Sequence, residues 1–594
     1  MLMKRSAYIP LSVCLSLLCS TAVYPSTPAF PEAEGFGRYA TGGRGGNVYY
    51  VTRLDDCSDN DLVEGTLRWA LRSGDDTPRT VLFKVCGTIY LTSKLKLQHP
   101  NVTIAGQTAP GGGVCVAGAN IYVCKPNVII RHIRFRAGDI PSASYPALDV
   151  ENTRNVIIDH CSLTWSMEEC LTMYDCDSTT VQWCIIGEGL YNSKNNKGNR
   201  SYAMQWGGEH STMHHTLITN CHNRTPRFNG TRDDAHIDQG KHDHDAFVDS
   251  EFQNNVIFNW GKKNSLYGGE NDTAVNKNAE GTPVGYCRVY MLNNYFRAGP
   301  TTLYCNLSDR YFVQGSKDKD YGQWFLSGNK FETGNKYNAS RDIWADSVLA
   351  RVNDNNLYGY ADNLKARAFN LDGKTASQQV MDQYVLNTQT VSSGTALQSA
   401  DEAYSAVCQH AGASLPRYDE EDRRLLDEAA GLRDPEFHGQ TIKTYLGIID
   451  SQNDITFIAE DYFHAGDSVA GGYPFLDALP CDSLALDTDG DGMPDLYETE
   501  QNLNPADPAD GAMVTESGYT NLELFLNGVA SGTIDKTRYE TLPYVSQQPE
   551  PPVHDAVETA AGSRLTDNAV ILDGAAITVE KDGKRYSLNG QKVK

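Results

Sequence analysis

Asn101-Val-Thr-Ile104, Asn127-Val-Ile-Ile130 and Asn155-Val-Ile-Ile158 repeat one pattern, an asparagine followed by three β-branched residues. Successive copies begin 26 and 28 residues apart. Short strands that recur at such a period, bounded by turn residues, indicate a stacked solenoid. Continuous apolar runs are typical of buried parallel strands, and an asparagine at the same corner of each coil can bond the turn of the next. The pattern predicts an all-β fold, a right-handed parallel β-helix.

The strand pattern continues beyond the repeat, and no amphipathic helix of useful length separates the runs, which disfavours βαβ units. A brief helix is expected at Leu67–Leu71, and apolar residues at helical spacing predict helix within Ser399–Asp434, which we interpret as a C-terminal cap on the solenoid. The further strand-like runs are Thr180–Ile186, Thr212–Ile218, Phe252–Phe258 and Arg288–Tyr295.

The N-terminus predicts export. Lys4 and Arg5 precede an apolar run, Tyr8–Cys19, and small residues follow it, which is typical of a secretory signal peptide. No later segment is long and apolar enough to span a membrane. We therefore expect a secreted protein, in the periplasm, at the cell surface or outside the cell, without a membrane span and monomeric.

The net charge of −24 argues against nucleic acid as a partner. An anionic substrate would need a locally basic groove, and the stretch Lys125–Arg232 offers one. The chain has 15 cysteines, and export permits disulfides. Cys57 and Cys86 are plausible disulfide partners. We expect the cysteines of the strand-like runs to be small buried core residues, namely Cys161, Cys184 and Cys221.

The segment Arg224-Thr-Pro-Arg227 follows the strand-like run Ser211–Cys221. Proline fixes φ and restricts the residue before it, so both arginines are expected on a stiff, exposed turn. Two fixed guanidinium groups suit carboxylates or phosphates in a row, although a surface turn with two solvated arginines is the alternative. Glu168 and Glu169 on a lower coil could share a cleft with the arginines, and their oxygens could hold Ca²⁺.

The Asn155–Leu163 run, the Arg224-Thr-Pro-Arg227 motif and the β-helix period together resemble polysaccharide lyase family one, the pectate lyases. The segments Gly35–Leu71 and Ala105–Gly113 also resemble that family, as found in gut and soil bacteria. The resemblance covers about residues Ala29–Asp434.

The resemblance implies calcium-dependent β-elimination on the acidic polysaccharide α-1,4-galacturonan (pectate), which leaves 4,5-unsaturated oligogalacturonides. In the family, Ca²⁺ bridges the enzyme and a uronate carboxylate, and an arginine removes the C5 proton. By motif position Arg224 is that base, while Arg227 and Lys197 would bind substrate carboxylates. A guanidinium group is normally always protonated, so an arginine base requires desolvation and nearby positive charge.

The resemblance also implies an active-site calcium held by Asp149, Glu168 and Glu169. Thr172 stands where a second carboxylate is common in the family. We therefore expect a site with fewer carboxylates, filled mainly when the substrate adds its own. Asp159 is expected to brace its coil, since aspartate readily bonds its own turn.

A second calcium signal is separate. The segment Asp487–Glu498, with the sequence DTDGDGMPDLYE, has the spacing of an EF-hand loop. Its role is predicted to be structural, pinning the module Asp482–Gly528 to the solenoid. The expected ligands are Asp487, Asp489, Asp491, the Met493 carbonyl, Asp495 and Glu498.

These features predict the organisation of the chain. The C-terminal ending Arg585–Lys592 resembles short segments on exported proteins of the Bacteroidetes, and His236–Asp245 could form a transition-metal site or, alternatively, a hydrated loop above the cleft. The expected parts are a signal peptide over residues 1–22, the β-helix lyase domain over 29–400, its C-terminal cap over 401–480, an EF-hand-like calcium-loop module over 481–545, and a linker with a tail over 546–594.

Three other functions remain open. A polygalacturonase on the same solenoid would need two carboxylates at a fixed separation, and the Gly-His-Gly and Arg-x-Lys signatures of that family are not found in the sequence. A pectin lyase, acting on methyl-esterified pectin, is a nearer variant. A non-catalytic β-helix that binds acidic glycans would keep the groove but would not need Arg224.

Overall fold

The computed structural model describes residues 27–139, 144–229, 247–261, 265–269, 286–305, 311–314, 322–333, 346–362, 378–458, 468–470, 483–543, 569–573, 576–581 and 584–587. The chain divides into two compact units, Met1–Gln547 and Gln548–Lys594. The predicted signal peptide and the His236–Asp245 insert lie outside the described residues.

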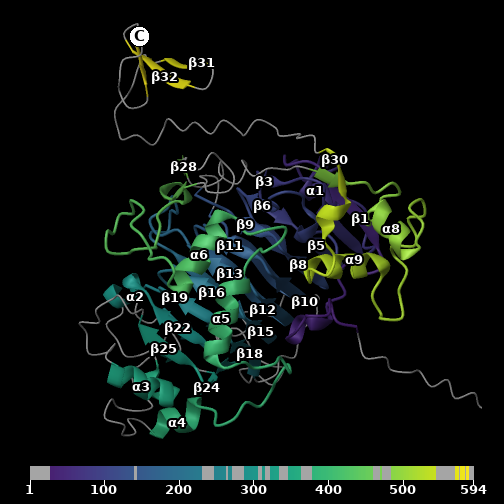
Figure 1. Ribbon diagram of the computed structural model, residues 1–594. Helices are drawn as coiled ribbons and strands as arrows, with labels where there is room; N and C mark the ends of the chain where they lie inside the picture. Colours follow the sequence, from purple (N-terminus) through teal and green to yellow (C-terminus); the bar gives the residue numbers. More distant parts are fainter. Residues whose placement is uncertain are drawn as a thin grey trace, which may run out of the picture. The chain divides into compact units, whose positions relative to one another are not determined.

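The first unit is built on parallel strands that stack coil upon coil, as the repeat predicts (Figure 1). The repeat pairs in register, because Val102 lies beside Val128 and Val128 beside Val156. Together with the family identified below, this arrangement is a right-handed parallel β-helix. One ladder of strands contains β1 (Asn47–Val51), β2 (Arg79–Phe83), β5 (Val102–Ala105), β8 (Val128–Arg131), β10 (Leu148–Asp159), β12 (Glu169–Gln182), β15 (Glu209–His214), β18 (Phe247–Gln253), β21 (Tyr286–Leu292) and β24 (Gln323–Ser327).

A second ladder joins the first at two long strands, β10 and β12, which pair with strands of both. Its other members are β4 (Leu95–Lys96), β7 (Ile121–Val123), β14 (Tyr202–Gly207), β17 (Arg227–Asn229), β20 (Tyr267–Gly268), β23 (Phe312–Gln314) and β26 (Tyr360–Asp362).

A separate nine-stranded parallel sheet forms another face of the solenoid. Apolar side chains from all three sets of strands fill the interior in one continuous core, as expected for a solenoid whose coils each contact only their neighbours. The sheet contains β3 (Gly87–Tyr90), β6 (Val114–Ala117), β9 (Arg134–Arg136), β11 (Ser162–Thr164), β13 (Ile185–Gly187), β16 (Leu217–Thr219), β19 (Val256–Phe258), β22 (Tyr295–Ala298) and β25 (Lys330–Thr333).

The repeat asparagines stand at one corner, as predicted. Asn101, Asn127 and Asn155 have φ of 58°, 59° and 53°, a left-handed conformation that asparagine tolerates better than most residues. The Asn127 amide donates to the Asn101 side-chain oxygen at 3.0 Å. The side chains therefore link neighbouring coils at this corner.

A second corner corrects the predicted strands. The run Thr180–Ile186 was expected to be one strand, but Trp183 has φ of 53° and divides it into the end of β12 and β13. His215 divides Thr212–Ile218 in the same way. The Trp183 and His215 rings stack at 4.3 Å. The two other runs break likewise at Asn254 and Asn293.

The helices predicted after the solenoid lie against the nine-stranded sheet. α5 (Ala400–His410) contacts β19 and β22, and α6 (Glu420–Ala430) contacts β16 (Figure 1). Buried Arg136 pairs with Asp419 at 2.7 Å and Asp422 at 3.0 Å, which anchors α6. Among the described residues, the other helices of this unit that precede residue 483 are α1 (Leu67–Arg72), α2 (Pro300–Cys305), α3 (Asp346–Asp354) and α4 (Gln378–Tyr384), with short 3-10 turns such as η1 (Phe36–Tyr39) and η2 (Gly106–Thr108).

Residues 483–543 form a small module against the first coils. β29 (Ser483–Ala485) pairs antiparallel with β30 (Glu540–Pro543), and α8 (Asp495–Gln501) and α9 (Asn521–Ala530) complete it. Their apolar side chains, including Phe525, pack on Leu82 of β2 and Ala105 of β5. The module's Glu523 pairs with Arg44 of the solenoid at 2.8 Å.

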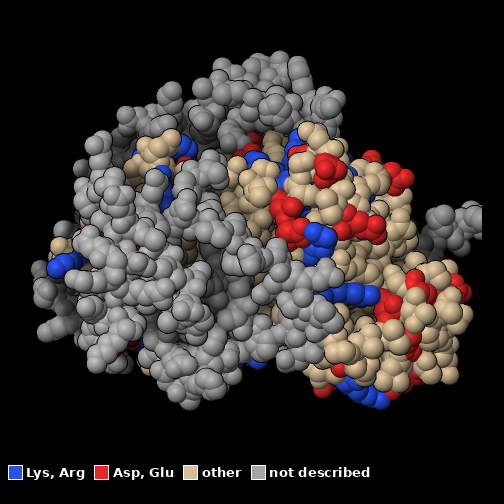
Figure 2. Space-filling model, turned by 90° about the horizontal axis from the view of Figure 1, so that it is seen from above, with Lys and Arg blue, Asp and Glu red and all other residues tan. Residues whose placement is uncertain are grey.

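The second unit contains an antiparallel sheet of β31 (Ala569–Asp573), β32 (Ala576–Lys581) and β33 (Lys584–Ser587). In the described part of the chain, no helix has both the length and the apolar character needed to cross a membrane. On the face seen in Figure 2, acidic and basic side chains are interspersed, and no continuous basic stripe crosses its described part.

The cysteines divide as follows. Cys161, Cys184 and Cys221 are fully buried free thiols in the core, as predicted. The predicted pairing of Cys57 with Cys86 is wrong, because Cys57 is a free thiol whereas Cys86 is in a disulfide. Cys57 instead contacts the Thr66 hydroxyl within its own loop at 3.3 Å.

Candidate active site

The site lies where the two ladders meet, on the outer face of β10, β12 and β14. Parallel register places Asp149 beside Thr172, Thr172 beside Gln205, and Gln205 beside Arg227. Because side chains alternate along a strand, these residues form one row across four coils. Next to this row is an open hollow of about 360 Å³.

Arg224 stands on the turn that leads from β16 into β17. Its backbone has φ of 59°, a conformation uncommon for a residue with a side chain. The turn is fixed to β14, because the Met204 amide donates to the Arg224 carbonyl at 2.9 Å. The guanidinium group forms an ion pair with Glu169 and lies over the Tyr202 ring, 4.2 Å from its centre.

Arg227 is not on the turn, contrary to the expectation that both arginines share it. It is the first residue of β17, because the proline between the arginines ends the turn and the chain rejoins the ladder. Its guanidinium donates to the Gln205 side-chain oxygen at 2.9 Å. Arg227 therefore belongs to the row of outward-facing residues beside the hollow, one coil beyond Gln205.

The three predicted calcium-binding carboxylates all line the hollow, and each already faces a cation. Asp149 pairs with Lys94 at 3.1 Å. Glu168 pairs with Lys197 at 2.8 Å and lies 3.6 Å from Arg200. The carboxyl groups are buried, whereas 63% of the Lys197 side chain is exposed. Arg224, Lys197 and the three acids are thus brought together as the sequence predicts.

Several residues of the site were not singled out from the sequence. Gln205 joins the two arginines, because its amide donates to Glu169 at 3.1 Å while its oxygen accepts from Arg227 and from Tyr174. Arg200 donates to the Tyr202 hydroxyl at 3.0 Å. Gln205 could have been identified only from its pairing with Thr172 in the neighbouring strand. The sequence does not reveal this pairing, because the length of the loop between β13 and β14 differs from that of the other coils' loops.

The donor set fits a calcium ion in part. Carboxylate oxygens are the ligands that Ca²⁺ prefers, and the three expected groups line one hollow together with Glu151. Their cationic partners, however, would compete with the ion. Such a site would bind Ca²⁺ weakly until a substrate supplies further carboxylates.

The predicted calcium loop has a different character. Oxygens of Asp487, Asp489 and Asp491 lie within 4.8 Å of one another. Glu498 is fully buried, and neither of its carboxylate oxygens has a hydrogen-bond partner. Burial and the neighbouring acids raise the pKa of Asp491 to about 7 and that of Glu498 to about 8. A cation would relieve this repulsion, so these residues fit a metal.

Two of the expected ligands of the loop, Asp495 and Met493, make hydrogen bonds within the loop. The Asp495 carboxylate accepts from the Thr488 amide at 2.7 Å and from its hydroxyl at 2.6 Å, so it braces the loop. The Met493 amide donates to Asp491 at 2.9 Å, and Met493 itself is buried. In addition, Asp510, which lies beyond the motif, has a carboxylate oxygen within 4.8 Å of Asp491 and Glu498.

Asp159 braces the solenoid, as predicted. It is fully buried and accepts from Arg131 at 2.7 Å and from Gln182 at 2.9 Å, and it contacts His160. The neighbouring His160, Arg131 and His132 hold the pKa of this carboxyl well below its usual range, although burial alone would raise it. All of its oxygen contacts are thereby made within the protein.

Comparison with known proteins identifies the family. A protein named "Probable pectate lyase C" from Aspergillus flavus is 30% identical over 518 residues, which cover 87% of this chain and 96% of that protein. This chain belongs to the pectate lyases. A protein of the same name, "Probable pectate lyase C", from Emericella nidulans is 29% identical over 531 residues, which cover 89% of this chain and 99% of that protein. As a pectate lyase the chain is an enzyme of the polysaccharide lyase class.

Solved pectate lyase structures are more distant. A pectate lyase from Bacillus sp. N165 in complex with trigalacturonate is 18% identical, with a TM-score of 0.38, over 64% of this chain and 98% of that one. A thermostable pectate lyase is 14% identical, with a TM-score of 0.39, over 65% and 97%. No family model matches the chain.

Proposed function

We propose that this pectate lyase cleaves α-1,4-galacturonan by calcium-assisted β-elimination and releases 4,5-unsaturated oligogalacturonides. The observation that supports the proposal most directly is the meeting of Arg224, Lys197 and three carboxylates around one hollow. The names of the relatives, both called probable pectate lyases, support an acidic polysaccharide as the substrate.

Arg224 is proposed as the base that takes the C5 proton of a galacturonate residue. In the structure its guanidinium is held in an ion pair with Glu169. It must leave this partner and give up its own proton to solvent before it can accept the C5 proton. The Tyr202 ring supports one face of the group, and the carbonyl of Arg224 is fixed by Met204. The turn would therefore hold Arg224 in place while its guanidinium moves from Glu169 to the sugar.

Lys197 and Arg227 are proposed to bind substrate carboxylates on either side of the reacting sugar. Lys197 is largely exposed at the rim, where a polymer can reach it, and Arg227 lies one coil along the row from Gln205. A guanidinium group suits bidentate pairing with a carboxylate. These two positions would fix the polymer along the solenoid axis.

Asp149, Glu168 and Glu169 are proposed to hold the active-site Ca²⁺. A bound Ca²⁺ would supply positive charge that makes the C5 proton of the sugar more acidic. Of the three residues, Glu169 is the one whose carboxylate also pairs with Arg224. Lys94 and Lys197 would move from Asp149 and Glu168 towards substrate anions.

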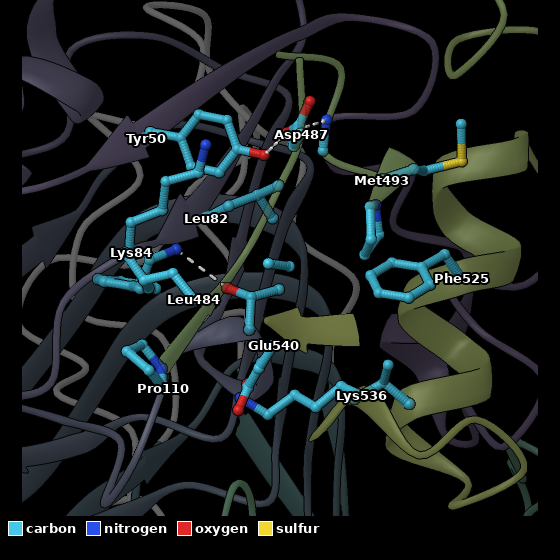
Figure 3. Close-up of a pocket in the computed structure, with 16 residues that line it drawn as sticks. Tyr50, Leu82, Lys84, Pro110, Leu484, Asp487, Met493, Phe525, Lys536 and Glu540 are labelled. Carbon is cyan, nitrogen blue, oxygen red and sulfur yellow. Dashed lines mark hydrogen bonds and ion pairs between the residues drawn. The ribbon is translucent and has the colours of Figure 1, made fainter. Parts of the chain in front are cut away.

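The loop Asp487–Glu498 is proposed as a structural calcium site that pins the module to the solenoid. Figure 3 shows Tyr50 and Lys84 of the solenoid facing Asp487 and Met493 of the module across a cavity of about 60 Å³. The Tyr50 hydroxyl donates to Asp487. Because a loop residue contacts the solenoid, the ordering of the loop by an ion would also order this contact.

We further propose that the protein is exported, with residues 1–22 as the signal peptide, and acts as a monomer. The proposed parts of the chain are those expected from the sequence: a lyase domain over 29–400, a cap over 401–480, a calcium-loop module over 481–545, and a linker and tail over 546–594.

The decisive experiment measures the ultraviolet absorbance of unsaturated uronide on polygalacturonate, with Ca²⁺ and then with a chelator. A rise that requires Ca²⁺ supports the proposal. New reducing ends without absorbance would mean hydrolysis. An Asp487→Ala variant controls for loosening of the module by the chelator.

One observation favours a second candidate, a pectin lyase on methyl-esterified pectin. Each of the three expected calcium-binding carboxylates already has a cationic partner, so these three groups are charge-paired without a metal. Equal absorbance on highly methylated pectin with and without chelator, and none on polygalacturonate, would select this candidate. Absence of turnover on both polymers, with binding retained, would leave a non-catalytic glycan-binding protein.

A further inference from the structure

The acidic cluster of the calcium loop extends past the twelve residues of its motif. Asp491, Glu498 and Asp510 each place one carboxylate oxygen within 4.8 Å of the others. Building on the proposed calcium loop, we infer that Asp510 is a ligand of the same ion and takes the position that the motif assigns to Asp495.

The side chain of Asp510 is held in place through one carboxylate oxygen, and its other carboxylate oxygen has no hydrogen-bond partner. Only 7% of the residue is exposed. Its Oδ2 accepts from the Asn504 amide at 2.8 Å, and its main-chain carbonyl accepts from the Asn521 side chain at 2.8 Å. Its Oδ1 is buried and has no hydrogen-bond partner. A buried carboxylate oxygen in that state is destabilising unless a cation neutralises it.

Other carboxylates of the two clusters, which share Asp491, also have unsatisfied oxygens. Glu498 is fully buried with both oxygens unpartnered, and one oxygen of Asp491 and one of Asp489 are unpartnered as well. Mutual repulsion among buried carboxylates is otherwise unfavourable. An ion between them accounts for all these oxygens at once.

Glycine at position 511 permits the close approach. A β-carbon on Gly511 would lie 2.2 Å from the Asp491 Oδ2 atom, well inside van der Waals contact. The chain after Asp510 can therefore pass directly over the loop only because residue 511 has no side chain. The approach brings Asp510 to the cluster although it lies twelve residues beyond Glu498.

Asp495 belongs to neither of the two carboxylate clusters of the loop, which are Asp487 with Asp489 and Asp491, and Asp491 with Glu498 and Asp510. Both of its carboxylate oxygens accept hydrogen bonds from Thr488. With one oxygen each from Asp487, Asp489, Asp491, the Met493 carbonyl and Asp510, and two from Glu498, the protein alone supplies a number within the range of about six to eight that Ca²⁺ takes. The site would then be closed to substrate and structural.

The test is a Ca²⁺ titration of the full-length chain by flow dialysis. Asp510→Asn keeps an oxygen for the Asn504 amide but removes the charge. Asp507→Asn is the matched control, because Asp507 is exposed and three residues away, and its carboxylate accepts from the Ala509 amide within its own turn. Glu498→Gln defines the loss of the loop site.

We expect Asp510→Asn to weaken the Glu498-dependent site by at least about tenfold, and Asp507→Asn to leave it as in the unaltered chain. Asp495→Asn, which loses part of the brace to Thr488, should weaken it less than Asp510→Asn does. Gly511→Ala, which keeps every carboxylate but presses on Asp491, should also weaken it, so the inference can be tested even if Asp510→Asn folds poorly. Circular dichroism at saturating Ca²⁺ reports folding.

The outcomes separate the two proposals. If Glu498→Gln binds Ca²⁺ as the unaltered chain does, the calcium loop itself is wrong. If Glu498→Gln loses the site while Asp510→Asn and Gly511→Ala keep full affinity, the loop binds calcium and the role of Asp510 is overturned. If Asp495→Asn weakens the site and Asp510→Asn does not, Asp495 is the ligand.

Discussion

The Arg224 guanidinium forms an ion pair with Glu169, and both side chains are largely shielded from water, with 17% and 7% exposed. A residue proposed as a base is thus bound to a residue proposed as a metal ligand. The pair connects the two halves of the proposed chemistry, because a change at Glu169 changes what Arg224 can contact.

Arg224→Ala should greatly reduce turnover while the protein still binds the polymer. The substitution removes the proposed base but leaves Lys197 and Arg227, so we expect kcat to fall by at least about a hundredfold, the lower range for general base catalysis. Binding of an oligogalacturonate, measured by calorimetry, should change little. The control is Arg433→Ala, because Arg433 lies exposed beyond α6. A modest loss of turnover equal to that of the control would contradict the role of Arg224.

Gln205→Leu should weaken the site without unfolding the solenoid. The variant loses the hydrogen bonds to Glu169, Tyr174 and Arg227 while keeping a similar volume. Each bond is worth about 1 kcal/mol, so kcat/KM should fall at least about fivefold. The loss of about 1 kcal/mol for each of the three bonds should lower the thermal unfolding midpoint by several degrees and leave the unfolding transition cooperative. Unchanged kinetics would show that the arginines do not need this link.

Arg136→Met should destabilise the cap. The substitution leaves Asp419 and Asp422 as buried charges with one partner fewer, and breaking a buried pair in this way destabilises a protein by about 3–5 kcal/mol. The expected result is a lower urea midpoint and earlier proteolysis at α5 and α6. Replacing the exposed Arg433 should have almost no effect. Equal midpoints for the two variants would mean that the buried cluster does not hold the cap.

Acid should destabilise the solenoid through its buried histidines. Burial lowers the pKa of His132 and His214 well below 6.5, so below pH about 6.5 the unfolded chain binds protons at these residues that the folded chain does not bind. The contribution of these histidines to stability is full above pH about 6.5 and falls as the pH decreases below it. Urea midpoints at a series of pH values measure the slope, which His214→Gln should make shallower. His410→Gln, at an exposed residue, is the control and should keep the original slope.

The repeat Asn101, Asn127 and Asn155 could be predicted from the sequence because its period and its turn residue are both local signals. The corners at Trp183 and His215 could not, since apolar residues continue across them and an aromatic residue in a left-handed conformation is uncommon. The partners of Glu168 and Asp149 depend on register and loop length. The position of Asp510 next to the loop could not be predicted, because the motif ends twelve residues before it.

The module that follows the cap returns to the beginning of the solenoid, where Leu82 and Ala105 pack against Phe525 and Glu523 meets Arg44. The coils synthesised first are therefore covered by residues synthesised almost last. Such long-range contacts form late in folding because the loop they close is large. A chain emerging from a ribosome or a translocation pore would keep the outer side of its first coils uncovered until nearly all of it had been released.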